Sequence, residues 1–275
     1  MSEEEKFIST KEYKKFEEFC NSCKDYSYIG LCHGIPGIGK TLSARRYSNW
    51  LNLKSFYDAN LLALIQTPQS IVITEKLVQC DTIMETASST NTPARIEKSI
   101  YSSAYALKFM KDFAANKTKE FCNSYKEAER FSEVKLIIVD EVDHLKYTSL
   151  EQLRAIYDRF GFGMVLIGMP GIERRLSRYP QLYSRVGFLH EFKSLSKDEM
   201  TFIIENHLQY LGTKINMDSF SDYETLNTIV RIAKGNLRVL TRLFQQLERL
   251  MRINNVTIIN VDLVNAAREV LVVGN

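Results

Sequence analysis

Residues 34 to 41 read Gly34-Ile35-Pro36-Gly37-Ile38-Gly39-Lys40-Thr41, which matches the G-x-x-x-x-G-K-[ST] pattern of a phosphate-binding loop. The glycines of such a loop let successive backbone N–H groups point inward at the β- and γ-phosphates of a nucleotide. Lys40 adds a mobile positive charge, and the hydroxyl of Thr41 is a ligand for Mg²⁺. The apolar residues 28–32 predict a buried parallel strand before the loop, and residues 42–50 predict the helix after it. We therefore expect a nucleoside triphosphate site.

The run Val134-Lys135-Leu136-Ile137-Ile138-Val139-Asp140-Glu141 supplies the acidic partner of this loop. The four residues before Asp140 are apolar, as in a central strand buried on both faces, so Asp140 lies at the sheet edge where ligands bind and completes the Mg²⁺ shell with Thr41. Glu141 is suited to orient or deprotonate an attacking water, which favours hydrolysis over phosphoryl transfer to a metabolite. The alternative is that both acids cap a helix that starts near Lys146. The expected nucleotide contacts come from the loop, the start of its helix and the acidic strand: Gly34, Pro36, Gly37, Ile38, Gly39, Lys40, Thr41, Leu42 and Asp140.

The composition is that of a folded protein of ordinary size. With 275 residues, of which 45% are hydrophobic, the chain can form one α/β domain with a small appendage. The N-terminus from Met1 to Lys6 is acidic and polar, and no apolar stretch reaches about 18 residues, so we expect a soluble cytoplasmic protein without a membrane partner. The net charge of +3 means that any nucleic-acid contact must come from a local basic surface.

The five cysteines are an odd number in a chain without an export signal, which predicts reduced thiols. Cys20 and Cys23 form one C-x-x-C pair, but no second pair or histidine at ligand spacing completes a zinc site. We expect the four histidines to be surface or packing residues.

Strands and helices alternate along the first two thirds of the chain, and helices alone follow from Ser194. The expected strands are 28–32, 82–86, 136–140, 163–168 and 187–192. The expected helices before residue 194 are 10–21, 42–50, a long helix from Pro93, 117–132, 149–160 and 171–177, with 56–66 and 71–78 helical or mixed. The later helices are 196–211, which starts with the capping box Ser196-Lys197-Asp198-Glu199, then 222–233, 237–253 and 261–270. This layout predicts an α/β fold of AAA+ type, with an N-terminal segment at 1–27, a P-loop αβα core with a parallel sheet at 28–193 and a small helical lid at 194–275.

Three later motifs accompany the phosphate-binding loop: Ile137-Ile138-Val139-Asp140-Glu141-Val142-Asp143-His144-Leu145, Val165-Leu166-Ile167-Gly168-Met169-Pro170 and Gln181-Leu182-Tyr183-Ser184-Arg185-Val186. Together the four motifs resemble the AAA+ transposition regulators of the MuB/TniB/TnsC group, over about residues 5 to 270. The N-terminus lacks the helix-turn-helix region of MuB, so short TniB-like or TnsC-like proteins are the nearer match. The resemblance implies an ATP hydrolase with ATP and Mg²⁺ as cofactors, slow until a partner stimulates it.

The resemblance also assigns roles outside the loop. Arg185 falls where the family places an arginine finger that acts in trans, and Arg238 resembles a sensor-2 arginine at the start of a lid helix. Phe7 and Ile8 lie where such chains pass over the adenine base. Arg185 could instead be a solvated surface residue, since Arg174, Arg175 and Arg178 are close by, and Arg238 could be a lid-surface charge. Gly168-Met169-Pro170 replaces the expected polar sensor-1 residue, which puts fast intrinsic hydrolysis in doubt.

An arginine finger in trans implies a homo-oligomer, either a ring or a helical filament, whose interface ATP assembles. A filament on double-stranded DNA needs basic side chains along its inner surface. The loop after the second strand and the helix that follows offer Arg95, Lys98, Lys108 and Lys111, although each could be an ordinary solvated charge.

The resemblance thus implies a transposition regulator that polymerises on double-stranded DNA, selects a target site and links a targeting protein, TniQ-like or similar, to a transposase. Hydrolysis would drive disassembly. Two alternatives stay open: an AAA+ helicase or clamp loader, and a signalling switch ATPase whose partners are proteins and not DNA.

Overall fold

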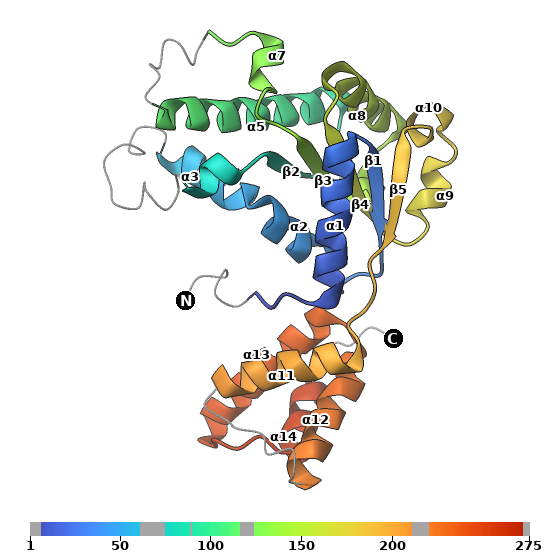
Figure 1. Cartoon of the computed structure of the whole chain (residues 1–275). Helices are drawn as coiled ribbons and strands as arrows, with labels where there is room; N and C mark the ends of the chain where they lie inside the picture. Colours follow the sequence, from blue (N-terminus) through green and yellow to red (C-terminus); the bar gives the residue numbers. More distant parts are fainter. Residues whose placement is uncertain (1–6, 61–74, 89, 116–123, 211–219, 272–275) are drawn as a thin grey trace. The chain divides into compact units, whose positions relative to one another are not determined.

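The structure, a computed structural model, describes residues 7–60, 75–88, 90–115, 124–210 and 220–271 (Figure 1). Contacts divide the chain into two compact units. We call them the sheet unit, residues 15–34 and 40–191, and the helical unit, residues 1–14, 35–39 and 192–275. The functional partition at 1–27, 28–193 and 194–275 stays a prediction.

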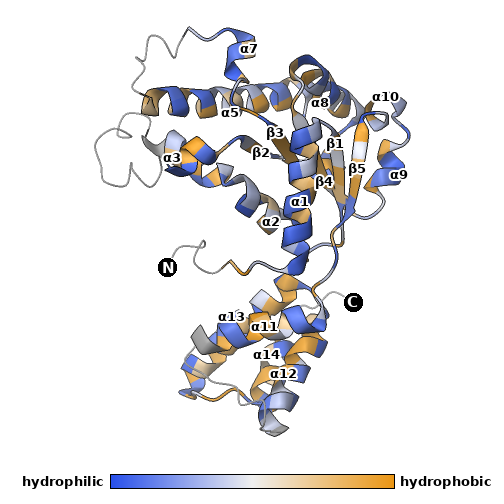
Figure 2. Ribbon diagram, viewed as in Figure 1, coloured by the Kyte–Doolittle hydropathy of each residue, from blue (hydrophilic) through white to orange (hydrophobic). Residues whose placement is uncertain are grey.

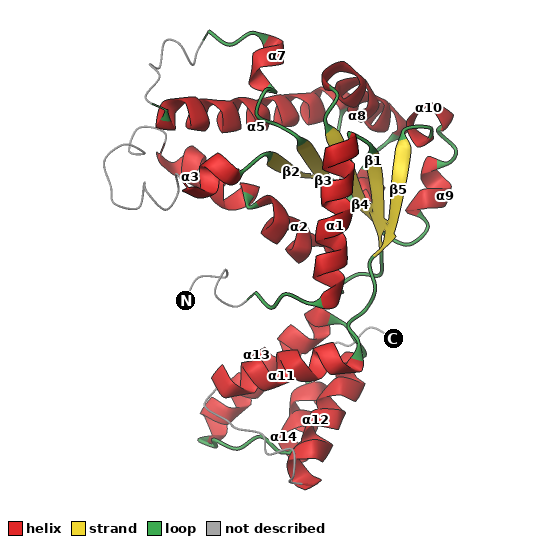
Figure 3. Ribbon diagram, in the orientation of Figure 1, coloured by secondary structure: helices red, strands yellow, loops and turns green. Residues whose placement is uncertain are grey.

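Five parallel strands form the sheet of the described chain, in the order β2-β3-β4-β1-β5 (Figure 3). They are β1 (Ile29–His33), β2 (Thr82–Thr86), β3 (Leu136–Asp140), β4 (Gly163–Gly168) and β5 (Val186–Glu191). Every residue of β3 and β4 is buried, so both faces of these strands are covered. Their continuous apolar runs predicted this, and the α/β fold with a parallel sheet is confirmed.

One helix precedes β1, and further helices connect the successive strands up to β5. They are α1 (Lys11–Tyr26), α2 (Lys40–Ser48), α3 (Trp50–Asn60), α5 (Pro93–Ala114), α7 (Glu127–Arg130), the 3₁₀ turn η2 (Val142–His144), α8 (Tyr147–Phe160), α9 (Ile172–Leu176) and α10 (Pro180–Tyr183). α1 approaches β1 closely because Gly30 has no side chain, and a Cβ there would lie 2.2 Å from Cys23 Sγ. Cys20 and Cys23 are buried in α1, and burial raises the pKa of the Cys23 thiol to about 12.

Two expectations about helices need correction, and two others fall partly outside the described residues. The helix predicted for 42–50 is two helices, because Asn49 adopts a left-handed conformation with φ of 49° between α2 and α3. Of the helix predicted for 117–132, residues 117–123 lie outside the described residues and the rest contains the four-residue α7. Residues 61–74, which hold parts of the predicted 56–66 and 71–78 segments, also lie outside them. The short helix α10 was not predicted.

The helical unit contains α11 (Lys197–Tyr210), α12 (Phe220–Ala233), α13 (Leu237–Asn254) and α14 (Val261–Glu269). Its core is a cluster of aliphatic side chains, including Ile204, Ile229 and Leu243, each fully buried. The predicted capping box is present: Glu199 N–H donates to Ser196 Oγ at 3.2 Å, and Ser196 N–H donates to Glu199 Oε2 at 3.0 Å.

Candidate nucleotide-binding site

The phosphate-binding loop joins β1, which ends at His33, to α2, which begins at Lys40. Gly37 and Gly39 have φ angles of 85° and 115°, a left-handed region that other residues rarely adopt. At Gly37 space is short as well, since a Cβ would lie 2.5 Å from the side-chain oxygen of Asn236. The pattern requires a glycine at position 39, where the backbone needs one, and Gly37 meets the same need at a position that the pattern leaves open.

Lys40 begins α2 and is buried. Its Nζ donates a hydrogen bond to the carbonyl of Gly34, the first residue of the loop. The ammonium group is thus held at the start of the loop by a neutral acceptor. This fits a residue whose charge faces the phosphates of a bound nucleotide.

Thr41 and Asp140 meet across the sheet unit. The Thr41 hydroxyl donates to Asp140 Oδ2 at 2.6 Å, and the backbone N–H of Glu141 donates to Asp140 Oδ1 at 2.8 Å. Asp140 is only 3% exposed, at the carboxyl end of β3. A hydroxyl and a carboxylate in contact, with oxygen atoms only, form a donor set that suits Mg²⁺. The residues present therefore fit a magnesium nucleotide.

Glu141 has a left-handed backbone with φ of 57°, and its side chain is 55% exposed. Its Oε2 lies 3.7 Å from Nε2 of His144, at the end of η2. The helix α8 starts after Lys146 without a side-chain cap, so the alternative that Asp140 and Glu141 cap this helix is not what the structure has. The exposed carboxylate leaves Glu141 able to reach a water molecule.

Two polar residues beside the predicted site were not expected. Asp143 Oδ2 accepts the backbone N–H of Met169 at 2.7 Å, at the end of β4 where the polar sensor-1 residue is absent. In the helical unit, Asn236 caps α13 and its Nδ2 donates to the carbonyl of Pro36 at 3.0 Å. Its position just before a helix could have marked Asn236 as a cap, but no sequence pattern signals its contact with the loop.

The remaining predicted nucleotide contacts lie as follows. In the helical unit, the backbone N–H of Arg238 donates to the Gly37 carbonyl at 2.9 Å, which brings this predicted sensor-2 residue beside the loop. Phe7 packs edge-on against Tyr13 with ring centroids 4.7 Å apart, and Ile8 packs on the aliphatic core of the same unit. Ile38 is buried, whereas Leu42 is 46% exposed. Their roles toward a nucleotide stay predictions.

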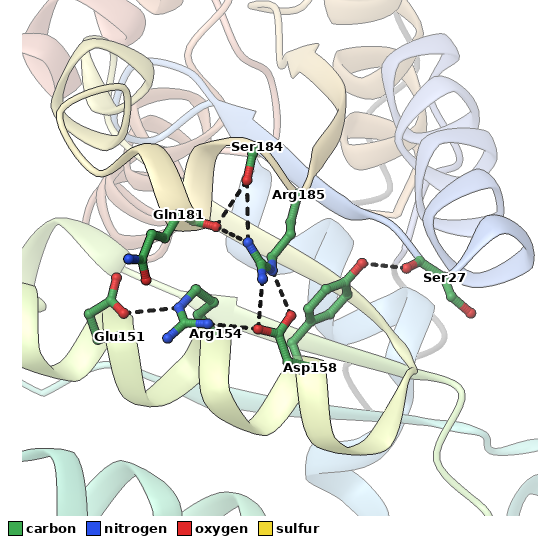
Figure 4. Close-up of polar contacts among 8 residues, drawn as sticks. Ser27, Glu151, Arg154, Asp158, Gln181, Ser184 and Arg185 are labelled. Atoms are coloured by element: carbon green, nitrogen blue, oxygen red, sulfur yellow. Dashed lines mark hydrogen bonds and ion pairs between the residues drawn. The ribbon is translucent and has the colours of Figure 1, made fainter.

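Arg185, the predicted arginine finger, is engaged within its own chain (Figure 4). Its Nε and Nη2 donate to the two carboxylate oxygens of Asp158 at 2.6 and 2.9 Å, and its Nη1 donates to the carbonyl of Gln181. Arg154 also pairs with Asp158, at 2.7 Å. The hydrogen bond from Arg185 is the main reason that the pKa of Asp158 is lowered. Arg185 must leave this pair before it can act on a neighbour.

The three nearby arginines differ from one another. Arg175 donates to the carbonyls of Asp143 and Leu145, so it braces the chain after β3. Arg174 and Arg178 are exposed, and neither forms an ion pair with any described residue.

The four candidate DNA contacts also differ in availability. Lys108 and Lys111 each lie within 3.3 Å of a carboxylate oxygen of Glu133, and Lys108 also pairs with Asp112 at 3.2 Å. Arg95 is exposed and donates to Thr90 Oγ1 at 3.1 Å. Lys98 is exposed beside a hollow of about 340 Å³. All four lie on α5, but the ion pairs of Lys108 and Lys111 would have to open before these residues could bind phosphates.

In the part of the chain that the structure describes, no helix is both long enough and apolar enough to span a membrane.

Comparison with known proteins connects this geometry to a family. The model of a family described as "AAA domain" matches residues 23–176. A Staphylococcus aureus protein named "Potential ATP-binding protein" is 42% identical over 274 residues, which is 100% of this chain and 99% of that protein. The "Mu-like prophage FluMu DNA transposition protein B" of Haemophilus influenzae is 30% identical over 118 residues, 40% of this chain and 38% of that protein.

The fold is also found among solved structures. The RuvB Holliday junction branch migration motor of Thermotoga maritima superposes with a TM-score of 0.58 at 17% identity, over 96% of this chain and 70% of that chain. At this identity the likeness concerns the fold alone. The residues matched by the family model include the phosphate-binding loop and the strand that ends in Asp140, and this chain belongs to the AAA domain family of P-loop ATPases.

Proposed function

We propose that this protein is an ATP hydrolase that regulates transposition, and that it assembles in its ATP state on double-stranded DNA as a ring or helical filament. The hydrogen bond of 2.6 Å between Thr41 and Asp140 carries the hydrolase part, because it joins the two predicted magnesium ligands at the carboxyl edge of the sheet. Bound Mg²⁺ would polarise the phosphate oxygens of ATP.

Each residue of the site has a separate task in this proposal. Lys40 neutralises charge on the phosphates, and Thr41 and Asp140 hold Mg²⁺. The Glu141 carboxylate orients the attacking water and accepts its proton. Arg238 and, from a neighbouring subunit, Arg185 stabilise negative charge on the phosphates. Residues 28–193 serve as the ATPase core, residues 194–275 serve as the lid, and Phe7 and Ile8 cover the adenine.

The similarity to the FluMu transposition protein supports the transposition part. On this proposal, the partners are double-stranded DNA, other copies of this chain, a transposase and a targeting protein. Hydrolysis is slow until one of these partners stimulates it, because Met169 stands where a polar residue would contact the nucleotide and Arg185 is held by Asp158. Stimulated hydrolysis then disassembles the oligomer from DNA.

Electron microscopy of the purified chain with a slowly hydrolysed ATP analogue tests the proposal, with and without a duplex of mixed sequence. We expect a ring or a helical coat that forms on DNA with the analogue and is lost with ADP. Assembly that is the same with and without DNA would favour a signalling switch ATPase with protein partners. Assembly that requires an added helicase would favour the helicase or clamp-loader alternative. Either result would contradict the proposal.

A further inference from the structure

The helix α13 of the helical unit carries four arginines on one face. They are Arg238, Arg242, Arg249 and Arg252, which we call the arginine stripe. At 3.6 residues per turn, the four side chains and Gln245 start within about 80° of the helix circumference. All five are exposed.

The opposite face of α13 is built into the core of its unit. Leu240, Leu243, Phe244 and Leu247 are buried there, so α13 divides sharply into an apolar side and a basic side. Figure 2 shows hydrophilic and hydrophobic residues interleaved along this helix. The core therefore fixes the rotation of α13 and holds the stripe toward solvent.

The stripe has no acidic partner among the described residues. Residues 225–254 contain six lysines and arginines and a single carboxylate, Glu248, which pairs with His207 at 3.1 Å. The side-chain hydrogen bond that Arg249 makes goes to Gln246, a neutral group. On α8, by contrast, Arg154 lies between Glu151 and Asp158. Like charges one turn apart, as at Arg238 and Arg242, destabilise a helix, so an external anion would relieve this repulsion.

The chemistry of the stripe points to phosphate groups. It consists of arginines without lysine, and the planar guanidinium can bind a phosphate through two N–H groups. Exposed aliphatic side chains lie only at the C-terminal end of the stripe, at Ile253, Val256 and Ile258, and none lies between Arg242 and Arg249 on this face, whereas a protein interface needs such anchors at its centre. The amide of Gln245 is a further group that binds a DNA backbone.

The length of the stripe suits an extended polyanion. From Arg238 to Arg252, α13 runs about 21 Å, a distance over which duplex DNA rises by about six base pairs. The backbone N–H of Arg238 donates to the carbonyl of Gly37 in the phosphate-binding loop, and in the proposed function Arg238 contacts the nucleotide. The other three arginines continue away from the loop along the same face.

We propose that Arg242, Arg249 and Arg252 on α13 bind the phosphate backbone of double-stranded DNA. This inference rests on the proposed function, in which the chain assembles on DNA, and it adds a second contact surface to the one expected on α5. Because the contacts are to phosphates, they do not select a base sequence.

The test uses the full chain with an ATP analogue and a fluorescent duplex, whose binding is followed by anisotropy between about 50 and 200 mM salt. The variant is Arg242→Gln/Arg249→Gln/Arg252→Gln, since glutamine keeps good helix propensity. The matched control is Lys193→Gln/Lys197→Gln/Arg268→Gln, three exposed residues of the same unit that lie outside α13 and change the charge equally. A charge-conserving variant, Arg249→Lys/Arg252→Lys, shows whether a loss of DNA binding is caused by the removed charge or by misfolding.

The stripe variant is expected to reduce the magnitude of the log–log salt slope by about 3, at roughly 0.9 per contact, while the control stays near wild type. The lysine variant is expected to keep the slope, and ATP affinity without DNA is expected to be unchanged in all variants. If wild type does not bind DNA even at low salt, the proposed function itself fails.

Three results would overturn the inference alone. In the first, wild type binds DNA and the stripe variant behaves as the control does. In the second, the stripe variant loses assembly in the absence of DNA, which makes the stripe a contact between copies of the chain. In the third, it loses ATP affinity, which places Arg242 in the nucleotide site.

Discussion

Thr41 and Asp140 are 99 residues apart in the sequence, and their contact shows how a few side chains define the candidate site. The Thr41 hydroxyl donates a hydrogen bond to one carboxylate oxygen of Asp140, and the backbone N–H of Glu141 donates to the other. Lys40, the residue next to Thr41, is held by the Gly34 carbonyl. Each of these three side chains therefore has a defined position before any nucleotide binds, which reduces the reorganisation that binding requires.

Lys40→Ala is expected to abolish nucleotide-dependent assembly, because the loop loses the cation that we propose faces the β- and γ-phosphates. The measurement is thermal unfolding with and without ATP and Mg²⁺, where ligand at about 100 times its Kd stabilises the wild type by about 2.7 kcal/mol. This stabilisation should be largely absent in the variant and intact in Lys193→Ala, an exposed control. An ATP affinity and filaments equal to those of the wild type would contradict the phosphate-loop assignment.

Glu141→Gln keeps the shape of the side chain but removes the carboxylate that we propose as the base. ATP should still bind, DNA-bound oligomers should persist longer, and steady-state hydrolysis should fall by about 100-fold or more. Phosphate release and the lifetime of the complexes on DNA measure the two effects. Glu173→Gln is the control, since this glutamate lies on α9 and not on the predicted site. Turnover at the wild-type rate would show that Glu141 is not the catalytic base.

The sequence predicted the central side chains of the site but not the residues that support them. Lys40, Thr41 and Asp140 stand at fixed positions within local motifs, so their neighbourhood follows once the strands are parallel. The contacts of Asn236 with Pro36 and of Asp143 with Met169 join residues that no local pattern relates. Such contacts depend on which loops lie next to each other in the folded chain. A single sequence contains no periodic pattern or motif that predicts them.

Between elements, the ion pair of Asp158 and Arg185 joins α8 to the segment that leads into β5. Arg185 cannot reach a neighbouring nucleotide while this pair is closed. If Arg185 acts in trans, Arg185→Ala should lower hydrolysis and cooperative assembly together and leave ATP binding by the monomer nearly intact. Asp158→Asn should instead keep or raise both the hydrolysis rate and cooperative assembly, because Arg185 loses its carboxylate partner and is free to move. Equal losses of hydrolysis and assembly in the two variants would indicate that the Asp158–Arg185 pair has only a structural role. A loss in Arg178→Ala alone would indicate that Arg178, which is exposed, is the arginine finger.

The same pair predicts how stability depends on pH. The pKa of Asp158 is lowered in the folded state, first by the hydrogen bond from Arg185, so the pair stabilises the fold above the unfolded-state pKa of about 4. This contribution is lost as the pH falls from that value through the lower folded-state pKa. Urea unfolding of wild type and Asp158→Asn should therefore differ at pH 7, and this difference should shrink as the pH falls below the unfolded-state pKa of about 4. A difference that persists in acid would mean that the pair is not its source.

Element types followed from the sequence where the apolar pattern was long and regular. All five strands lie within one or two residues of the predicted ranges. The reason is clearest for β3 and β4, which are buried along their whole length and are nearly continuous apolar runs. The break between α2 and α3 was missed because it depends on Asn49 in a left-handed conformation, which many asparagines do not adopt. In the described part of the helix predicted for 117–132, only Glu127–Arg130 is helical, because the charged residues of 126–133 fit a short turn before β3 as well as a helix.

For the whole molecule, DNA binding should depend on charge and not on base sequence. Of the residues expected on α5, Lys98 is exposed, whereas Lys111 pairs with Glu133 at 3.2 Å. Lys98→Gln should therefore reduce the salt slope by about 1 per bound subunit. Lys111→Gln should leave the slope unchanged and destabilise the fold by less than about 1 kcal/mol. A larger effect of Lys111→Gln than of Lys98→Gln on the salt slope would show that the ion pair between Lys111 and Glu133 opens when DNA binds. A strong preference for one base sequence would contradict binding through the DNA backbone.

The strand order has a consequence for how the chain is made. β1 lies between β4 and β5, and Ile29 pairs with Met164 on one side and Val186 on the other. At roughly 5–20 residues per second, a ribosome needs on the order of ten seconds to deliver β4 after β1. Throughout this interval the apolar strand that leads into the phosphate-binding loop has neither of its lateral neighbours. The nascent protein is therefore most exposed to misassembly early, and nucleotide binding belongs to the last stage of its folding.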